Sequence, residues 1–306
     1  MKYFDAHCDT ATEIYEKNQD LFKNDLHIDI EKASNISAYA QVFAVFGDYS
    51  KDLTNRFENT YNYFTQMLKE NESKIALVSN RIELENAVSN GKIAAILSIE
   101  GAEVLNCSPI KLEAAYNLGV RMTGITWNYD NALSGCSKIS NTKGLTAQGK
   151  SYVQKANELN ILVDVSHVSD AAFFDIAATG SRFLASHSNS RAVCAHSRNL
   201  TDEQFILISR TGGVAGINLY ADFLTNGKKC TLTDVIRHIE HFAALCGTNN
   251  IAIGADFDGC ERLPEGINTI ADMHRLSDEL VKLNYNQNVI DNIFFNNLFN
   301  LFQTAL

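Results

Sequence analysis

The chain has 306 residues, of which 45% are hydrophobic and 20% charged, and its formal net charge at pH 7 is −10. The hydrophobic content is sufficient for a sizeable core, and the length suits either two ordinary domains or one large α/β barrel. The negative charge, with no basic block to offset it, argues against nucleic acid or an anionic membrane surface as the main partner.

The start of the chain and its cysteines indicate the cellular setting. Asp5 and Asp9 fall where a signal peptide would need an apolar core, and no later run approaches the ~20 apolar residues of a membrane span. We therefore expect a cytoplasmic protein. The seven cysteines are scattered without a C-x-x-C motif, which favours reduced thiols over a disulfide framework. No linker is visible, so we predict a single domain over 1–306.

Short apolar, β-branched runs alternate with helix-like stretches along the chain. We predict strands at 2–7, 39–46, 92–100, 121–127, 161–167, 182–188, 214–220 and 251–259. We predict helices at 51–72, 110–117, 146–159, 170–179, 202–211, 233–246, 270–283 and 288–304. Thr201 with Gln204 is typical of a capping box, and Ser169 of a helix N-cap.

This alternation predicts the fold. Eight strands, most of them apolar on both faces and separated by helices, favour a (β/α)8 TIM-type barrel. An open doubly wound sheet is the alternative, but no G-x-G-x-x-G follows the first strand to support it.

Side chains that could bind a metal lie at the C-terminal ends of five of the eight predicted strands. They are His7 and Asp9 at the end of the first, Glu100 of the third, His167 of the fifth, His187 of the sixth, and Asp256 and Asp258 of the eighth. Active sites of such barrels lie at the C-terminal ends of the strands. We therefore expect these side chains to meet at one rim.

Taken singly, each residue has an ordinary explanation, such as His167 capping the helix that begins near Ser169. Together, buried carboxylates and imidazoles are costly unless a cation lies among them. Nitrogen and carboxylate ligands without thiolate suit Zn²⁺, with Mn²⁺, Co²⁺ or Fe²⁺ as alternatives. The set exceeds what one tetrahedral zinc needs, and two metals bridged by one carboxylate would use all of it.

The H-x-D spacing occurs twice. His7 and Asp9 would point to the same side of the first strand, because residues two apart on a strand share a face. His27 and Asp29 have the same spacing but no preceding strand of their own. We expect the second pair to lie off the rim and exclude it from the site.

The motifs, in order, resemble those of the renal (membrane) dipeptidase family, which are binuclear zinc peptidases on an amidohydrolase-like barrel. The matching strings are DAHCDT, SIEGAE, GVRMTGITWN, DVSHVS, ASHSNSRAVCAHSRN and IGADFDG. They run from the first predicted strand to the eighth, and SHSNSRAVCAHSRN and GADFDG are the most specific. The resemblance implies a zinc dipeptidase with two Zn²⁺ per chain and a dipeptide as its partner.

The resemblance also implies a role for each site residue. Five are implied as ligands: His7 and Asp9 for one zinc, His167 and His187 for the other, and Glu100 as the bridge. Arg198 would bind the free C-terminal carboxylate of the substrate, since a guanidinium pairs bidentately with a carboxylate. Asp256 would lie beside the substrate amine and a hydroxide that both metals share, which attacks the peptide bond.

Trp127 is a departure from the family, because renal-type members carry His at this position after Leu-Thr. It is the only tryptophan of the chain, and packing at the barrel mouth and contact with substrate are both open roles. Another metallohydrolase acting on a carboxylate-bearing amide, such as a β-lactam, is an alternative function. A non-catalytic barrel is disfavoured because all five ligands are present. The sequence is compatible with a homodimer but does not specify one.

Overall fold

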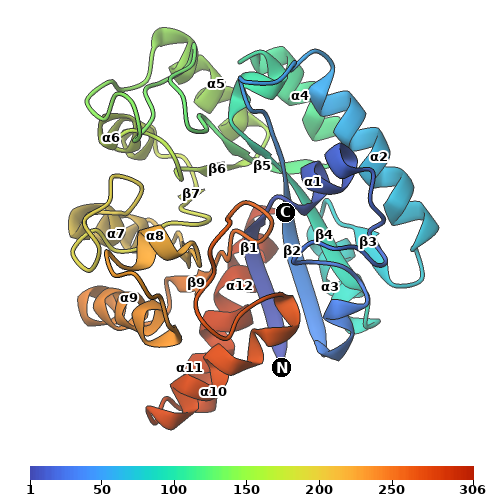
Figure 1. Ribbon diagram of the computed structural model, residues 1–306. Helices are drawn as coiled ribbons and strands as arrows, with labels where there is room; N and C mark the ends of the chain where they lie inside the picture. The colour runs from blue at the N-terminus through green and yellow to red at the C-terminus, as the bar shows by residue number, and fades with distance from the viewer.

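The computed structural model describes residues 1–306 as parallel strands surrounded by helices (Figure 1). Eight strands form the barrel: β1 (Lys2–Cys8), β2 (Ala38–Phe46), β4 (Ile93–Glu100), β5 (Val120–Gly124), β6 (Leu162–Asp164), β7 (Phe183–Leu184), β8 (Ala215–Ile217) and β9 (Ile251–Ile253). They run in the order β7-β6-β5-β4-β2-β1-β9-β8, and a parallel bridge between Ala185 and Ala215 joins the two ends. The predicted (β/α)8 barrel is confirmed.

Helices cover the outside of the strands (Figure 1). They are α1 (Thr10–Lys17), α2 (Arg56–Glu70), α3 (Arg81–Ser89), α4 (Pro109–Asn117), α5 (Ala147–Glu158), α6 (Asp170–Ala178), α7 (Asp202–Arg210), α8 (Ala221–Leu224), α9 (Leu232–Cys246), α10 (His274–Lys282), α11 (Gln287–Asp291) and α12 (Asn297–Ala305). Short 3-10 turns occupy Lys32–Asn35, Ala102–Leu105 and Ile270–Asp272. None of the helices has the length and apolar character needed to span a bilayer.

Two helix starts follow the expected capping chemistry. The Thr201 hydroxyl accepts from the amide of Gln204, whose side chain accepts from the amide of Thr201, so the predicted capping box is present. The Ser169 hydroxyl likewise accepts from the amide of Ala172. The sequence pattern missed the helices α1, α3 and α8 and the short strand β3 (Ile75–Leu77), which pairs with the first half of β4. The predicted helix 288–304 is interrupted by a π-helical turn at Asn292–Asn296.

One end of the barrel is closed by α12. The barrel interior is filled by small and medium apolar residues such as Ala6, Ala40 and Ile96, which share a buried cluster with residues of α12. Phe302 of that helix packs on Phe4 of β1 with ring centroids 5.3 Å apart. The N-terminal end is therefore sealed by apolar contacts, which leaves the C-terminal end of the strands for a site.

The last four strands are much shorter than predicted, and β5 ends three residues earlier than predicted. β6, β8 and β9 have 3 residues each and β7 has 2. The predicted runs therefore continue into loops, and His167, His187 and Asp256 each lie three positions beyond the last strand residue. His167 and Asp256 have φ angles of 69° and 60°, which an extended strand cannot contain. The chain bends before it presents these side chains.

Candidate metal centre and substrate pocket

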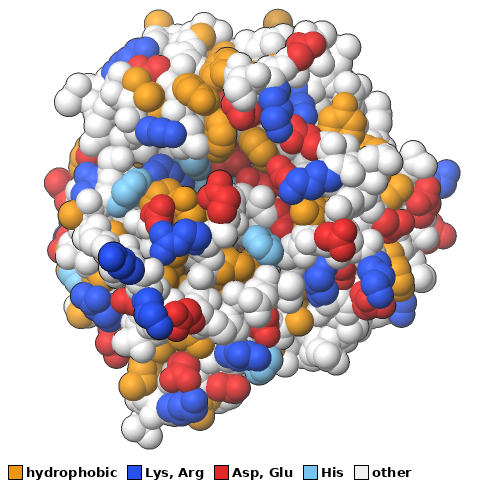
Figure 2. Space-filling model, viewed as in Figure 1, with side chains coloured by type: hydrophobic (Ala, Val, Ile, Leu, Met, Phe, Trp, Pro, Cys, Tyr) orange, Lys and Arg blue, Asp and Glu red, His pale blue; other side chains and the backbone are white.

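The C-terminal ends of the strands surround a cavity of about 870 Å³. Figure 2, in the same view as Figure 1, shows a hollow near the middle of this face, with acidic and histidine side chains in it. Its lining includes the predicted site residues Asp9, Glu100, Trp127, His167, Arg198 and Asp256. His7 and His187 are buried against Glu100. The predicted residues therefore converge at one rim.

A β-bulge presents His7 to this cluster. The register between β1 and β2 shifts between Asp5 and Cys8, so one extra residue lies on β1. Asp9 is not part of the strand but precedes the first turn of α1. The His7 and Asp9 side chains do meet, with Nε2 3.4 Å from Oδ1, but a bulge and a helix start bring them together. The predicted same-face pairing on a regular strand is wrong.

His7, Asp9 and Glu100 form a first group of donor atoms. His7 Nε2 lies 3.4 Å from Glu100 Oε2 and 3.8 Å from Asp256 Oδ1. Both ring nitrogens of His7, Oδ1 of Asp9 and Oε2 of Glu100 are buried without a hydrogen-bond partner. Buried polar atoms are rarely left unpaired, so this group fits a ligand that accepts their lone pairs.

His167, His187 and the other oxygen of Glu100 form a second group. Glu100 Oε1 lies 2.9 Å from His167 Nε2 and 3.5 Å from His187 Nε2, and the two Nε2 atoms are 2.9 Å apart. His167 Nδ1 faces the Asn128 side-chain oxygen at 3.2 Å, and His187 Nδ1 faces Ser186 Oγ at 2.6 Å. These partners favour a proton on each Nδ1, which turns the lone pairs of both Nε2 atoms toward each other.

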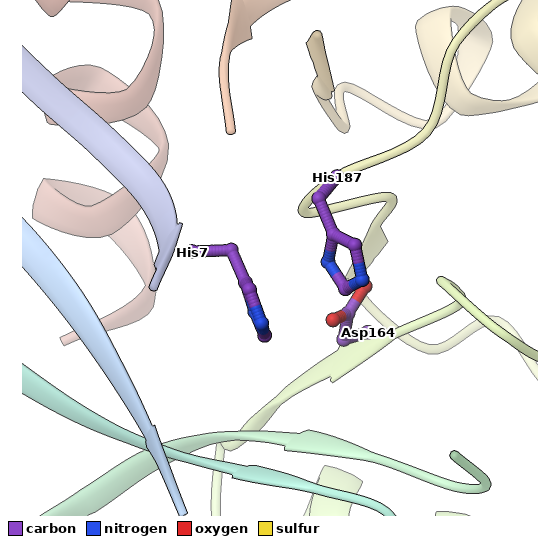
Figure 3. Close-up of side chains that lie close together, drawn as sticks. All are labelled: His7, Asp164 and His187. Atoms are coloured by element: carbon purple, nitrogen blue, oxygen red, sulfur yellow. The ribbon is translucent and has the colours of Figure 1, made fainter. Parts of the chain in front are cut away.

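Ser186 and Asp164 fix the orientation of His187. Ser186 Oγ donates to Asp164 Oδ2 at 2.5 Å, and Asp164 Oδ1 accepts from the amides of Ser166 and Ser186, each at 2.9 Å. Figure 3 shows the rings of His7 and His187 reaching toward each other, with the Asp164 carboxylate beside His187. Asp164 lies close enough to count as a donor, but both of its oxygens already accept hydrogen bonds. It therefore anchors the side chain of His187.

A glycine lets the His187 loop approach the neighbouring strands. A Cβ at Gly254, the residue after β9, would lie 1.7 Å from the Ser186 carbonyl oxygen. No side chain other than hydrogen fits there. The close approach places His187 above the inside of the barrel.

The charge states of Glu100, His167 and His187 favour ligation. The histidine neighbours hold the pKa of Glu100 well below its usual value although burial opposes this, so Glu100 is ionised. Burial lowers the pKa of His167 to about 4 and that of His187 well below its usual value, so both are neutral. Burial and the nearby Glu100 carboxylate raise the pKa of Asp9. For His7, the same carboxylates outweigh burial and raise the pKa.

The donor set fits divalent cations. Neutral imidazoles with free Nε2 atoms and an ionised carboxylate are the forms that bind Zn²⁺. Two nitrogen lone pairs 2.9 Å apart repel each other, and a cation between the donors relieves that repulsion. Glu100 offers one oxygen to each group. The geometry therefore suits two ions that share Glu100.

Arg198 and Asp256 lie at the same cavity. Arg198 is only 6% exposed, its Nε has no partner, and no carboxylate of the protein lies within salt-bridge distance of it. Burial lowers its pKa, so Arg198 is not an ordinary exposed surface arginine. Asp256 Oδ2 accepts from Asn218 at 2.9 Å, and burial raises the pKa of Asp256 to about 6.

His27 lies at the cavity, so the prediction that it falls off the rim is wrong. Its backbone amide donates to Asp258 Oδ1 at 2.6 Å, and its Nδ1 accepts from the Asp258 amide at 2.9 Å. Thr10 Oγ1 donates to the other oxygen of Asp258 at 2.6 Å, so this carboxylate is fully used in holding loops. Asp29 is elsewhere and accepts from Lys32 Nζ at 2.6 Å.

The structure is compatible with both roles predicted for Trp127, packing at the barrel mouth and contact with substrate. It is half-buried, its ring lies 5.5 Å from that of Phe46 and 5.8 Å from that of Tyr129, and it lines the cavity. Four supporting residues were missed from the sequence: Asn128, Asp164, Ser186 and Asn218. Asn128, Asp164 and Ser186 lie in the motifs WN, DVSH and ASH, next to or close to a predicted site residue. This proximity in sequence could have identified them.

The chain is similar to known proteins over most of its length. The chain is 34% identical over 244 residues to an uncharacterised protein from the pqqA 5′ region of Klebsiella pneumoniae, covering 76% of this chain and 89% of that protein. It is 30% identical over 239 residues to an uncharacterised dipeptidase of Schizosaccharomyces pombe, covering 76% of this chain and 55% of that one. A metallo peptidase from Rhodobacter sphaeroides, solved with a phosphinate mimic of the dipeptide L-Ala-D-Ala, matches with a TM-score of 0.92 at 21% identity, over 100% of this chain and 99% of that one.

The model of one family spans nearly the whole sequence. It describes the membrane dipeptidases and matches residues 1–305. The chain therefore belongs to the membrane dipeptidase family, peptidase family M19, and is a metallopeptidase.

Proposed function

We propose that the protein is a dipeptidase with two divalent metal ions, Zn²⁺ by the chemistry of its ligands, that hydrolyses dipeptides with a free C-terminal carboxylate. One observation carries this proposal: two groups of donor atoms share Glu100 beside an unpaired, buried Arg198. The dipeptide mimic bound by the Rhodobacter relative supports a substrate of this size.

The metals would be held by the two donor groups. His7 and Asp9 would bind one ion, His167 and His187 the other, and Glu100 both. When bound, such ions lower the pKa of a water molecule toward neutrality and polarise the scissile carbonyl. Ser186 and Asn128 hold the rings of the second pair with Nε2 facing the site.

Arg198 and Asp256 would act on the substrate. Arg198 binds the C-terminal carboxylate and so sets the substrate length at one residue beyond the cleaved bond. Asp256, fixed by Asn218 through Oδ2, keeps Oδ1 toward His7. That oxygen takes up the proton of the attacking water and delivers it to the leaving amine, which a carboxyl group with a raised pKa does well.

Metal content and substrate cleavage test the proposal together. We expect two metal ions per fully loaded chain, loss of dipeptide cleavage on chelation and its return with Zn²⁺. Glu100→Gln should lower occupancy of both sites, whereas Asp29→Asn, outside the cavity, should keep two ions. At most one ion in fully loaded wild-type protein would refute the shared site. Protein that binds two ions but cleaves no dipeptide, or cleaves only a β-lactam, would refute the proposal that dipeptides are the substrates.

A further inference from the structure

Two apolar patches line the cavity on opposite sides of the candidate metal centre. Tyr220 and Phe223 form one, with ring centroids 4.9 Å apart, and Phe46 and Trp127 form the other, 5.5 Å apart. Tyr220 and Phe223 follow β8. Phe46 ends β2 beside Glu100 of β4, and Trp127 follows β5.

The strand order places these patches across the barrel from each other. In the ring β7-β6-β5-β4-β2-β1-β9-β8, strand β4 stands four positions from β8 in either direction, and β2 and β5 flank it. Arg198 belongs to the β8 side, because its guanidinium lies 5.5 Å from the Phe223 ring. The donor atoms of Glu100 and the histidines lie between the two patches.

This arrangement orients a bound dipeptide, given the proposed function. Its C-terminal carboxylate binds Arg198 on the β8 side, and its scissile carbonyl lies at the donor atoms. Its N-terminal residue then extends toward β4 and its neighbours. We infer that the side chain of this N-terminal residue packs against Phe46 and Trp127, and that the preferred dipeptides carry a large apolar residue, aromatic or branched aliphatic, at that position.

The surroundings of this patch favour an apolar side chain over a charged one. Lys51 and Asp48 also line the cavity there, but Lys51 pairs with Glu16, and Asp48 accepts from the Ser50 amide at 2.8 Å. Neither is left without a partner, and Lys138 of the loop after β5, which lines the cavity without an ion-pair partner, is exposed to water. Burying an unpaired charge against the two rings would be unfavourable.

Trp127 also contacts a second pair of aromatic rings. Tyr129 packs on it at 5.8 Å, and Tyr49 packs on Tyr129 at 5.4 Å. A ring held in place before binding loses little conformational freedom when it contacts the ligand. The patch is therefore a formed surface rather than one that the substrate must assemble.

Turnover of a Xaa-Ala series tests the inference on the metal-loaded protein, with Gly, Leu, Phe, Asp and Lys as Xaa. We expect kcat/KM for Phe-Ala and Leu-Ala to exceed that for Gly-Ala, Asp-Ala and Lys-Ala by about tenfold or more, as burial of a large apolar side chain gives. Trp127→Ala should reduce the Phe-Ala to Gly-Ala ratio to within about threefold, and Trp127→Phe should keep most of it. Phe174→Ala, an exposed aromatic of α6, is the matched control and should keep the whole ratio.

Fluorescence gives a readout that does not depend on turnover. Trp127 is the only tryptophan, so the tryptophan emission of the protein reports on this patch alone. A phosphinate mimic of Phe-Ala should change that emission, and a mimic of Gly-Ala, bound through the same carboxylate, should change it less. The wild-type protein suffices for this measurement, whether or not a Trp127 variant folds.

The outcomes separate two failures. Cleavage of every dipeptide at similar rates, a Trp127→Ala variant that loses activity on all of them equally, or equal emission changes with both mimics would overturn the inference and leave the dipeptidase intact. Absence of cleavage of any dipeptide by protein loaded with metal would overturn the proposed function, and the inference with it.

Discussion

Arg198→Ala should make the enzyme indifferent to the charge at the substrate C-terminus. The guanidinium is 6% exposed, Nε lacks a partner, and its hydrogen bond to the His187 carbonyl is long at 3.5 Å. No protein carboxylate competes for it. A substrate carboxylate would therefore gain a sheltered, charge-assisted pair rather than replace an existing one.

The burial of Arg198 sets the expected size of the effect on kcat/KM. A hydrogen-bonded pair to a charged group contributes about 1.5–3 kcal/mol, which is roughly one to two orders of magnitude in kcat/KM. Converting the substrate C-terminus to an amide should cost wild-type protein this factor. Arg198→Ala should lose a similar factor on free dipeptides and almost nothing on amides. Arg198→Lys should recover part of it, because an ammonium cannot form the fork.

The assay measures kcat/KM of wild type and variant on one dipeptide and its amide. Arg191→Ala is a matched control, because the Arg191 guanidinium already pairs with both oxygens of Asp170, at 2.7 and 2.8 Å. It should keep the preference for the free carboxylate even if it lowers stability. Equal losses on both substrates in Arg198→Ala would mean that Arg198 supports the fold or the metal ligands, and the argument on substrate length would fail.

Three further predictions follow from the contacts. Asp256→Asn should lower kcat by about 10²-fold or more with metal content unchanged. Asp258→Asn should mainly lower thermal stability, because the Asp258 carboxylate holds two loops through hydrogen bonds. The reverse pattern would show that Asp256 is not the residue that moves the proton. Ser186→Ala should weaken metal affinity by about 10–100-fold, measured by competition with a chelator, because His187 loses the partner of Nδ1; unchanged affinity would refute the anchoring role. His238 is fully buried, its Nδ1 accepts from the Ser190 amide, and burial lowers its pKa to about 4. The contribution of neutral His238 to the free energy of unfolding is complete above about pH 6.5 and is lost as the pH falls toward 4, by about 3 kcal/mol at the lower end. The free energy of unfolding should therefore fall more steeply from pH 7 to 5 in wild type than in His238→Gln. Parallel slopes would contradict this.

The alternation of apolar runs and helices was enough to predict the barrel, because a parallel barrel buries both faces of every strand. The predicted strands 2–7, 39–46 and 92–100 agree within one residue with β1, β2 and β4. The later strands were predicted too long, because the loops that follow them are also buried and carry apolar residues such as Val165, Ala185 and Ala255. Periodicity cannot tell a buried loop from a buried strand.

The residues of the site were easier to predict than the geometry that assembles them. The bulge before His7 depends on the register between two strands, which no local pattern gives. His27 reaches the cavity through two hydrogen bonds with Asp258, 231 positions away, each between a backbone amide and a side chain. Contacts of this kind form only in the folded barrel, so the sequence of neither segment predicts them.

The anchor at Asp164 explains how two loop histidines reach a tight geometry. Its carboxylate accepts hydrogen bonds from the loop after β6 and the loop after β7, so the strings DVSH and ASHS fold as one unit. That unit brings the Nε2 atoms of His167 and His187 to 2.9 Å from each other, a close approach that a shared cation stabilises. Metal binding should therefore stabilise the folded state chiefly through these two loops, while the apolar barrel beneath them stays folded without it.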